Sequence, residues 1–165
     1  MEREILDRVC LRMMEFEAGN PDRIQHFVKV HALAALIGRA EGLDPKTQFT
    51  LEAAAYVHDI GIAASLKHYG SADGKYQEEL GEIPSREILR ECGVDSATYW
   101  RVSYLVAHHH TYNAIEDADH RILVEADFLV NLQEGDQSPE VIRQTYDKIF
   151  RTKTGRAICA AMFGL

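Results

Sequence analysis

The sequence lacks the features of several protein classes. Its three cysteines lie far apart and form no Cys-x-x-Cys pair, so neither a zinc ribbon nor a disulfide framework is indicated. No stretch reaches the roughly 18 to 20 apolar residues that cross a bilayer, because even residues 122–132 contain Glu125, Asp127 and Asn131. The N-terminus shows no signal-peptide pattern. We therefore expect a soluble, cytoplasmic protein with no membrane partner.

Basic charge is also scarce. The chain has 18 lysine and arginine residues against 26 aspartate and glutamate residues, which gives a formal net charge of −8. Binding to a nucleic-acid backbone needs a basic face, so nucleic acid is not expected as a partner. A small anionic substrate stays compatible with this composition, because a divalent cation and a few local bases can reverse the field inside one pocket.

Strand patterns are missing, whereas helix starts recur. No run of four to eight residues alternates apolar and polar side chains between turn signals. Asn20-Pro21, Asp44-Pro45 and Ser138-Pro139 each place a capping side chain before a proline suited to the first helical position. At 165 residues we expect a single domain, residues 1–165, folded as an all-α bundle. Eight helices are expected, at about residues 2–18, 21–41, 45–60, 73–80, 84–92, 96–110, 119–134 and 139–163.

Glycines mark several of the expected helix ends. Gly42, Gly61, Gly93 and Gly135 follow apolar-periodic segments, where a residue with positive φ often closes a helix. The last helix is expected to break near Gly155. The only long irregular segment is expected at about residues 61–73, and such loops are often functional.

Four polar side chains fall where the helical pattern predicts burial. His26 is in phase with an apolar stripe, the adjacent His58 and Asp59 end an apolar helix, and Asp127 shares a face with apolar neighbours. Burying two unpaired carboxylates would be costly, and a divalent cation removes that cost. Two imidazoles and two carboxylates suit one ion of Mn²⁺, Fe²⁺, Co²⁺, Ni²⁺, Mg²⁺ or Zn²⁺.

Three segments carry a resemblance to a known family. Arg23-Ile-Gln-His26, then Ala54-Ala-Tyr-Val-His58-Asp59-Ile-Gly61, then Glu125-Ala-Asp127 resemble the H…HD…D signature of HD-domain proteins, across about residues 20–132. The resemblance implies an all-helical fold and hydrolysis of phosphate esters. It also implies four metal ligands, namely His26, His58, Asp59 and Asp127.

A second likeness points to a pocket. Residues 69–78 and 109–112 look like those of a bacterial subgroup whose substrate is unknown. Many HD phosphohydrolases have a lysine directly after HD-x-Gly, but Ile62 stands there in this chain. A phosphate-binding cation must then come from elsewhere, and the candidates are Lys75, Lys67 and Arg23, the last one turn before His26.

The remaining histidines are assigned by their helical phase. His108, His109 and His110 cannot all face inward, because consecutive helical residues point about 100° apart. His109 has the apolar phase and could act as a general acid, bind substrate or, with His68, hold a second metal; His110 is assigned to substrate binding. Two further histidines, His31 and His120, are interpreted as structural or surface residues.

The leading functional hypothesis is metal-assisted hydrolysis of a phosphomonoester or phosphodiester, with a nucleotide as the first candidate. A bound metal would lower the pKa of water from about 15.7 toward about 7 and polarise the phosphoryl oxygen. Asp59 would orient that water or accept its proton, and His109 or Lys75 would stabilise developing charge. We expect one tightly held metal per chain, with any second ion weak.

Two alternatives stay open. The missing lysine is compatible with a sensor module that binds metal and nucleotide without turnover. A di-iron oxygenase of the HD type would need two irons and further histidine ligands. If the chain forms a homo-oligomer, the candidate contact is the apolar tail at residues 157–163.

Overall fold

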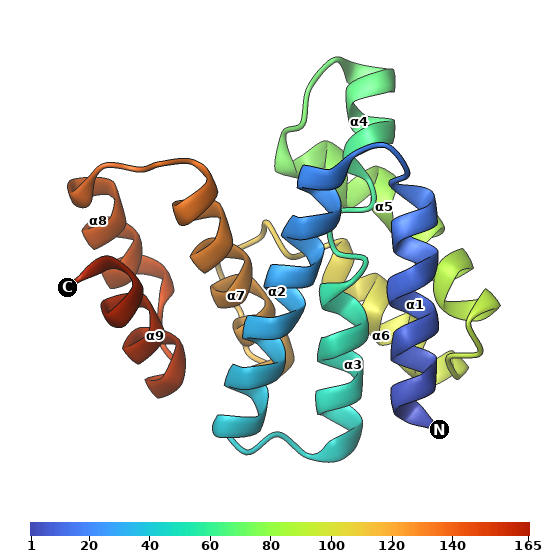
Figure 1. The fold of residues 1–165 in the computed structure, drawn as a ribbon, viewed down its shortest axis with the longest axis horizontal. Helices are drawn as coiled ribbons and strands as arrows, with labels where there is room; N and C mark the ends of the chain where they lie inside the picture. Colours follow the sequence, from blue (N-terminus) through green and yellow to red (C-terminus); the bar gives the residue numbers. More distant parts are fainter.

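The structure is a computed structural model that describes residues 1–165, and it contains nine α-helices and no strand (Figure 1). The all-helical prediction is confirmed. None of the helices has the length and apolar character needed to span a membrane. The helices are α1 Glu2–Phe16, α2 Pro21–Ala40, α3 Pro45–Ala55, α4 Ile62–Tyr69, α5 Gly74–Glu91, α6 Ser96–Val106, α7 Ala118–Glu134, α8 Pro139–Ile149 and α9 Lys153–Phe163.

The expected caps form at the starts of α2, α3 and α8. The side chain of Asn20 accepts a hydrogen bond from the backbone of Arg23, and Asp44 and Ser138 cap their helices in the same way. Each cap satisfies a backbone N–H that has no partner inside its helix. The positive φ expected for helix-closing glycines occurs at Gly42 and Gly93, whereas Gly135 closes α7 with a φ of −81°.

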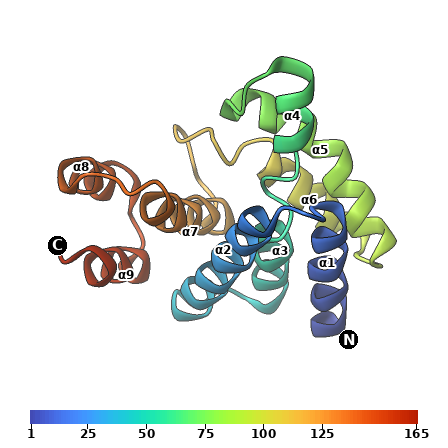
Figure 2. The same ribbon diagram turned by 45° about the horizontal axis from the view of Figure 1, so that its top comes forward.

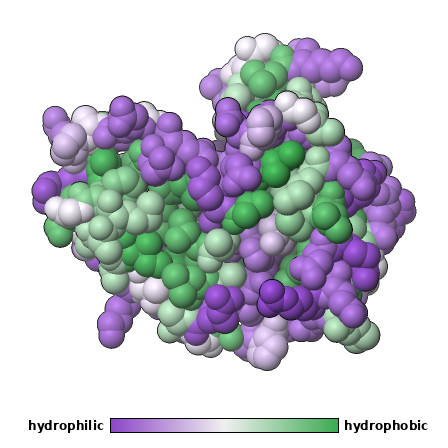
Figure 3. All heavy atoms as spheres, in the orientation of Figure 1, coloured by the Kyte–Doolittle hydropathy of each residue, from purple (hydrophilic) through white to green (hydrophobic).

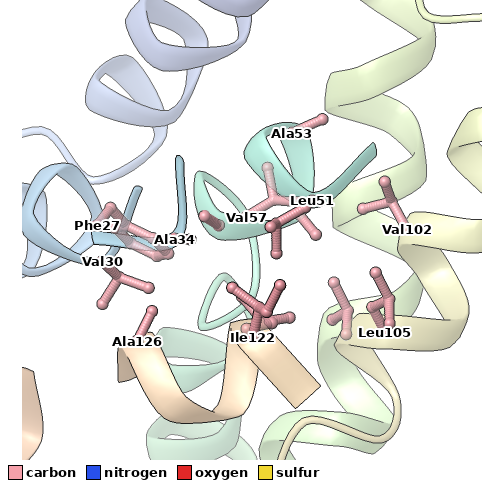
Figure 4. Close-up of a cluster of buried hydrophobic side chains, with 14 of the residues drawn as sticks. Phe27, Val30, Ala34, Leu51, Ala53, Val57, Val102, Leu105, Ile122 and Ala126 are labelled. Atoms are coloured by element: carbon pink, nitrogen blue, oxygen red, sulfur yellow. The ribbon is translucent and has the colours of Figure 1, made fainter. Parts of the chain in front are cut away.

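The core lies between α2, α3, α6 and α7. α2 packs against both α3 and α7, and α3 also contacts α6 and α7. Figure 4 shows side chains from these four helices meeting in one cluster, among them Phe27, Leu51, Leu105 and Ile122, all of which are at most 1% exposed. Burial of this apolar surface stabilises the bundle at roughly 25 cal/mol per Å². This packing fixes α2, α3 and α7 relative to one another.

The segment at residues 61–73 differs from the expected loop. Most of it forms the helix α4, and only a short connection leads to α5. Gly61 has a negative φ, contrary to the expectation, and a side chain there would run into the backbone of Gln77 and Gly81. This glycine therefore permits the close approach of α5 rather than a helix end.

α5 is one helix rather than the two expected. It continues through Pro84, which removes one N–H from the helical hydrogen-bond ladder. Gly81, Ser85 and Ile88 are nevertheless buried along one face. The packing of this face against the bundle therefore stabilises the helix enough to offset the hydrogen bond lost at Pro84.

The last two helices, α8 and α9, form a C-terminal hairpin that a buried carboxylate holds to α7. Glu125 is fully buried and accepts hydrogen bonds from the backbone N–H groups of Arg151 and Thr152, at 2.6 and 2.9 Å. The chain therefore turns at residues 150–152, between α8 and α9, so the last expected helix does break, a few residues before Gly155. Gly155 lies in the first turn of α9, where a side chain would collide with the Glu125 carboxylate.

One face of the molecule carries an apolar area. Figure 3 shows it over the part where α9 and α2 lie in Figure 1. Leu36 of α2 and Met162 of α9 are 47% and 43% exposed. Cys159 of α9 is fully buried, so the apolar tail packs in part within its own chain.

Candidate metal centre

A tight turn places the adjacent His58 and Asp59. α3 ends at Ala55, five residues before the expected end, and residues 56–61 form successive turns with backbone bonds such as Ile60 N–H to Val57 C=O at 3.1 Å. Because α3 ends in small buried alanines, residues 53–55, the turn that follows can pack inside the core. His58 is fully buried and Asp59 is 4% exposed.

His26 of α2 and Asp127 of α7 complete a compact group with these two residues. One donor atom from each of the four residues lies within 4.8 Å of all the others. His26 Nε2 is 3.3 Å from Asp59 Oδ2 and 3.2 Å from Asp127 Oδ1. His58 Nε2 is 3.6 and 3.4 Å from the same two oxygens. The structure thus brings together all four residues proposed from the sequence as metal ligands.

The outer nitrogens of the two histidines are already engaged. His26 Nδ1 lies 2.8 Å from Glu134 Oε2, and His58 Nδ1 lies 2.9 Å from the carbonyl oxygen of Ala55. Because these oxygens accept hydrogen bonds, each Nδ1 carries a hydrogen, and each Nε2 faces the carboxylates as the nitrogen that a metal would bind. Metal-binding histidines are commonly oriented in this way by an outer carboxylate or carbonyl.

The donor atoms face one another as acceptors, so the metal-free site must hold protons. Burial disfavours the imidazolium form, but hydrogen bonds to Asp127 and Asp59 outweigh it and raise the pKa of His26 to about 10. Burial would raise the pKa of both aspartates, yet the surrounding histidines lower it below the ordinary value. A divalent cation can replace these protons, so the buried His/Asp cluster is compatible with a divalent metal site.

Asp59 also belongs to a second group of donors. Its Oδ1 lies 3.0 Å from His109 Nε2 and 3.9 Å from His110 Nε2. α6 ends at Val106, earlier than expected, and His109 occupies the following turn, where it is 1% exposed. Asp59 thus faces two histidine groups with its two oxygens.

Two polar hollows flank the cluster. One, of about 380 Å³, is lined by Arg23, His26 and Glu134, and Arg23 Nη1 donates to Asp59 Oδ2 at 3.1 Å. The other, of about 550 Å³, is lined by Lys75 and His110. The structure therefore places the proposed phosphate-binding cations Arg23 and Lys75 in different hollows.

The two segments that resemble the bacterial subgroup meet at the second hollow. Gln77 and Glu78 of α5 hydrogen-bond to His110, and Glu78 also accepts from Thr111. Figure 2 shows the α6–α7 connection lying between α7 and the pair α4 and α5. Burial lowers the pKa of His110 to about 4, so its imidazole is neutral at pH 7.

Other candidates lie outside both donor groups. His68 is exposed in the last turn of α4, so its expected place in a loop is wrong, and Lys67 beside it is also exposed. His31 stacks on Tyr56 at 3.9 Å between ring centroids. His120 Nε2 lies 2.9 Å from the carbonyl oxygen of His108.

Sequence reasoning missed three residues around the cluster. These are Glu134, Gln77 and Asn131, whose side-chain amide donates to Asp127 Oδ1 at 2.8 Å. Asn131 and Glu134 follow Asp127 by four and seven residues on α7, so the helical period could have found them. Gln77 lies in the segment 69–78 marked by the second likeness, but no helical period indicates its contact with His110.

The HD-domain family model matches residues 23–144 of the sequence. The chain belongs to the HD-domain family. No curated protein matches this HD-domain sequence. Among solved structures, it is similar to the crystal structure of a predicted HD superfamily hydrolase from an uncultured Thermotogales bacterium, at 23% identity and a TM-score of 0.65, across 98% of this chain and 84% of the other. At this identity, the likeness shows that the two HD proteins share a fold.

Proposed function

We propose that this HD-domain protein is a metal-dependent hydrolase of phosphoric esters. The observation that carries the proposal is the group of four donor atoms within 4.8 Å, from residues no more than 4% exposed. Two imidazoles and two carboxylates at this spacing match the ligands that divalent transition metals and Mg²⁺ prefer. In our proposal His26, His58, Asp59 and Asp127 hold one such ion, whose identity the donor set leaves open among Mn, Fe, Co, Ni, Mg and Zn.

The bound ion would supply a Lewis acid that lowers the pKa of water and polarises a phosphoryl oxygen. The protein would supply proton transfer and positioning. Asp59 orients the attacking water and accepts its proton, which it can share with His109 because their polar atoms are 3.0 Å apart. His109 then offers a proton where negative charge develops.

The cations of the two hollows suggest how a substrate is bound. Arg23 contacts Asp59 directly, so its remaining N–H groups can meet a phosphoryl oxygen beside the ion. Lys75 and His110 line the other hollow and would bind the rest of the substrate. Tyr112 adds an aromatic wall that suits a planar base, which supports a small nucleotide as substrate.

A phosphate-release screen tests this function. Metal-free protein is reloaded with Mn²⁺, Co²⁺, Ni²⁺ or Mg²⁺ and given phosphomonoesters and phosphodiesters, nucleotides among them. We expect phosphate or nucleoside monophosphate release that stops when the metal is chelated. Nucleotide binding without release would instead favour the sensor function, which Ile62 in place of lysine motivates.

The second donor group favours an oxidative alternative. Asp59, His109 and His110 could contribute to a second iron site, as a di-iron oxygenase requires. Oxygen consumption by the iron-loaded protein, in the absence of phosphate release, would support that alternative over the hydrolase.

A further inference from the structure

Four imidazoles surround Asp59, and one differs from the other three. His26, His58 and His109 each have Nδ1 within 2.9 Å of an oxygen acceptor, so Nε2, which faces the carboxylates, is the nitrogen that can bind a metal once any proton on it is displaced. In His110 the arrangement is reversed. Its Nε2 lies 3.0 Å from Oε1 of Gln77.

The neighbours of Gln77 determine which atom donates. Its Nε2 is 2.6 Å from the carbonyl oxygen of Ala72, and because a carbonyl oxygen only accepts, the amide nitrogen must face it. The amide oxygen therefore faces His110, and His110 Nε2 carries the hydrogen. The hydroxyl of Tyr112, 3.0 Å from His110 Nδ1, donates to that second nitrogen.

We propose that Gln77 determines how many metal ions the centre holds. A ring nitrogen that carries a hydrogen has no lone pair for a metal. Gln77 thereby removes His110 from the group of Asp59, His109 and His110 and leaves only two donors for a second ion. The inference rests on the metal centre of the proposed function, and limits that centre to one tightly bound ion.

The packing of α5 fixes the position of His110 beside Gln77. Gln77 is 7% exposed, and a Cβ added at Gly74 would lie 2.7 Å from His110 Cβ. Glu78 Oε1 accepts a hydrogen bond from the backbone N–H of His110 at 2.9 Å. The first turns of α5 thus hold both the ring and the backbone of His110.

Substitution of Gln77 by leucine tests the inference. Gln77→Leu keeps a similar volume and removes the amide, so His110 can carry its hydrogen on Nδ1 and bind metal through Nε2, while the Tyr112 hydroxyl accepts. Metal-free protein is titrated with Mn²⁺, the bound equivalents are counted, and paramagnetic resonance reports coupling between adjacent ions. We expect about one tight equivalent in the wild type and about two, magnetically coupled, in Gln77→Leu.

Matched variants complete the design. Gln77→Leu/His110→Ala should return to about one equivalent, and Gln144→Leu, at an exposed position of α8, should behave as wild type. A single tight equivalent in folded Gln77→Leu would overturn the inference. So would a second tight ion in the wild type, or loss of the first ion in His110→Ala. If the proposed metal centre itself is wrong, the wild type will bind no ion, which distinguishes that result from failure of the inference about Gln77.

Discussion

At the scale of single residues, both ring nitrogens of His26 have a carboxylate partner, and the outer partner is Glu134. Its Nε2 faces the aspartates, while its Nδ1 donates to Glu134, whose other oxygen pairs with Lys29 at 2.6 Å. Such an outer carboxylate fixes the ring and increases its basicity toward a metal. Glu134 is therefore a positioning residue that contacts no reacting atom.

Removal of Glu134 should weaken metal binding. We expect Glu134→Ala to lower metal affinity by about 10- to 100-fold, because His26 loses its orienting acceptor. Glu134→Gln keeps an acceptor oxygen and should lose less. Competition with a chromophoric chelator measures both, with Glu140→Ala on the exposed side of α8 as control. Wild-type affinity in Glu134→Ala would show that Glu134 does not position His26.

Lys75 makes a second prediction at this scale. Lys75 lines the hollow beside His110, and its Nζ lies 4.6 Å from the centroid of the Tyr76 ring. If it binds a substrate phosphate, Lys75→Met should lower kcat/KM by about 10- to 100-fold, the range of one charge-assisted hydrogen bond. Metal content should not change. Steady-state kinetics beside a Lys153→Met control measure this. Unchanged kinetics would show that Lys75 is a surface residue that does not bind substrate.

At the scale of elements, α7 joins the site to the C-terminal hairpin. Asp127 faces the donor group, whereas Glu125, two residues earlier, holds the start of α9 through hydrogen bonds from Arg151 and Thr152. The other oxygen of Glu125 accepts a hydrogen bond from the Thr152 hydroxyl at 2.5 Å. The turn between α8 and α9 therefore depends on the side chain of Glu125.

Glu125→Ala should destabilise the fold. It would leave the backbone N–H groups of Arg151 and Thr152 without their acceptor, which we expect to lower the free energy of unfolding by about 1 to 3 kcal/mol. Denaturant unfolding beside Glu116→Ala, an exposed substitution, measures the difference. Equal stability of the two variants would contradict the anchoring role of Glu125.

Local signals explain which elements were predictable. The caps and prolines at residues 20, 44 and 138 act within one turn, so α2, α3 and α8 begin where the sequence indicates. α4 has no cap side chain of its own, and Pro84 is overridden by packing. Tertiary contacts decide both cases, and no short window of sequence contains them.

The residues of the metal site also differ in how far the sequence could place them. His26 and Asp127 could be placed inward because they lie in long helices with apolar stripes. His58 and His109 lie in turns beyond their helices, so their burial depended on chain paths that helical phase only approximates. Gln77 acts through a partner 33 residues away, and periodicity gives no sign of that contact.

At the scale of the whole molecule, metal binding should depend on pH. Because the pKa of His26 is raised to about 10, its proton stabilises the metal-free protein below an unfolded-state pKa of about 6.5. This stabilisation is lost as the pH rises through about 10, so a metal displaces the proton more easily at higher pH. The gain in thermal stability on adding Mn²⁺ should therefore grow from about pH 6 to about pH 8.5. A gain that does not change with pH would contradict proton displacement.

The metal content of the wild type and of His58→Ala, measured with phosphate release, tests the central claim most directly. His58 is fully buried with its Nε2 beside both aspartates, and the apolar core forms independently of this one side chain. We expect about one equivalent of metal and phosphate release in the wild type. His58→Ala should lose both while it keeps its helix content by circular dichroism. Full metal retention in folded His58→Ala would contradict the proposed centre.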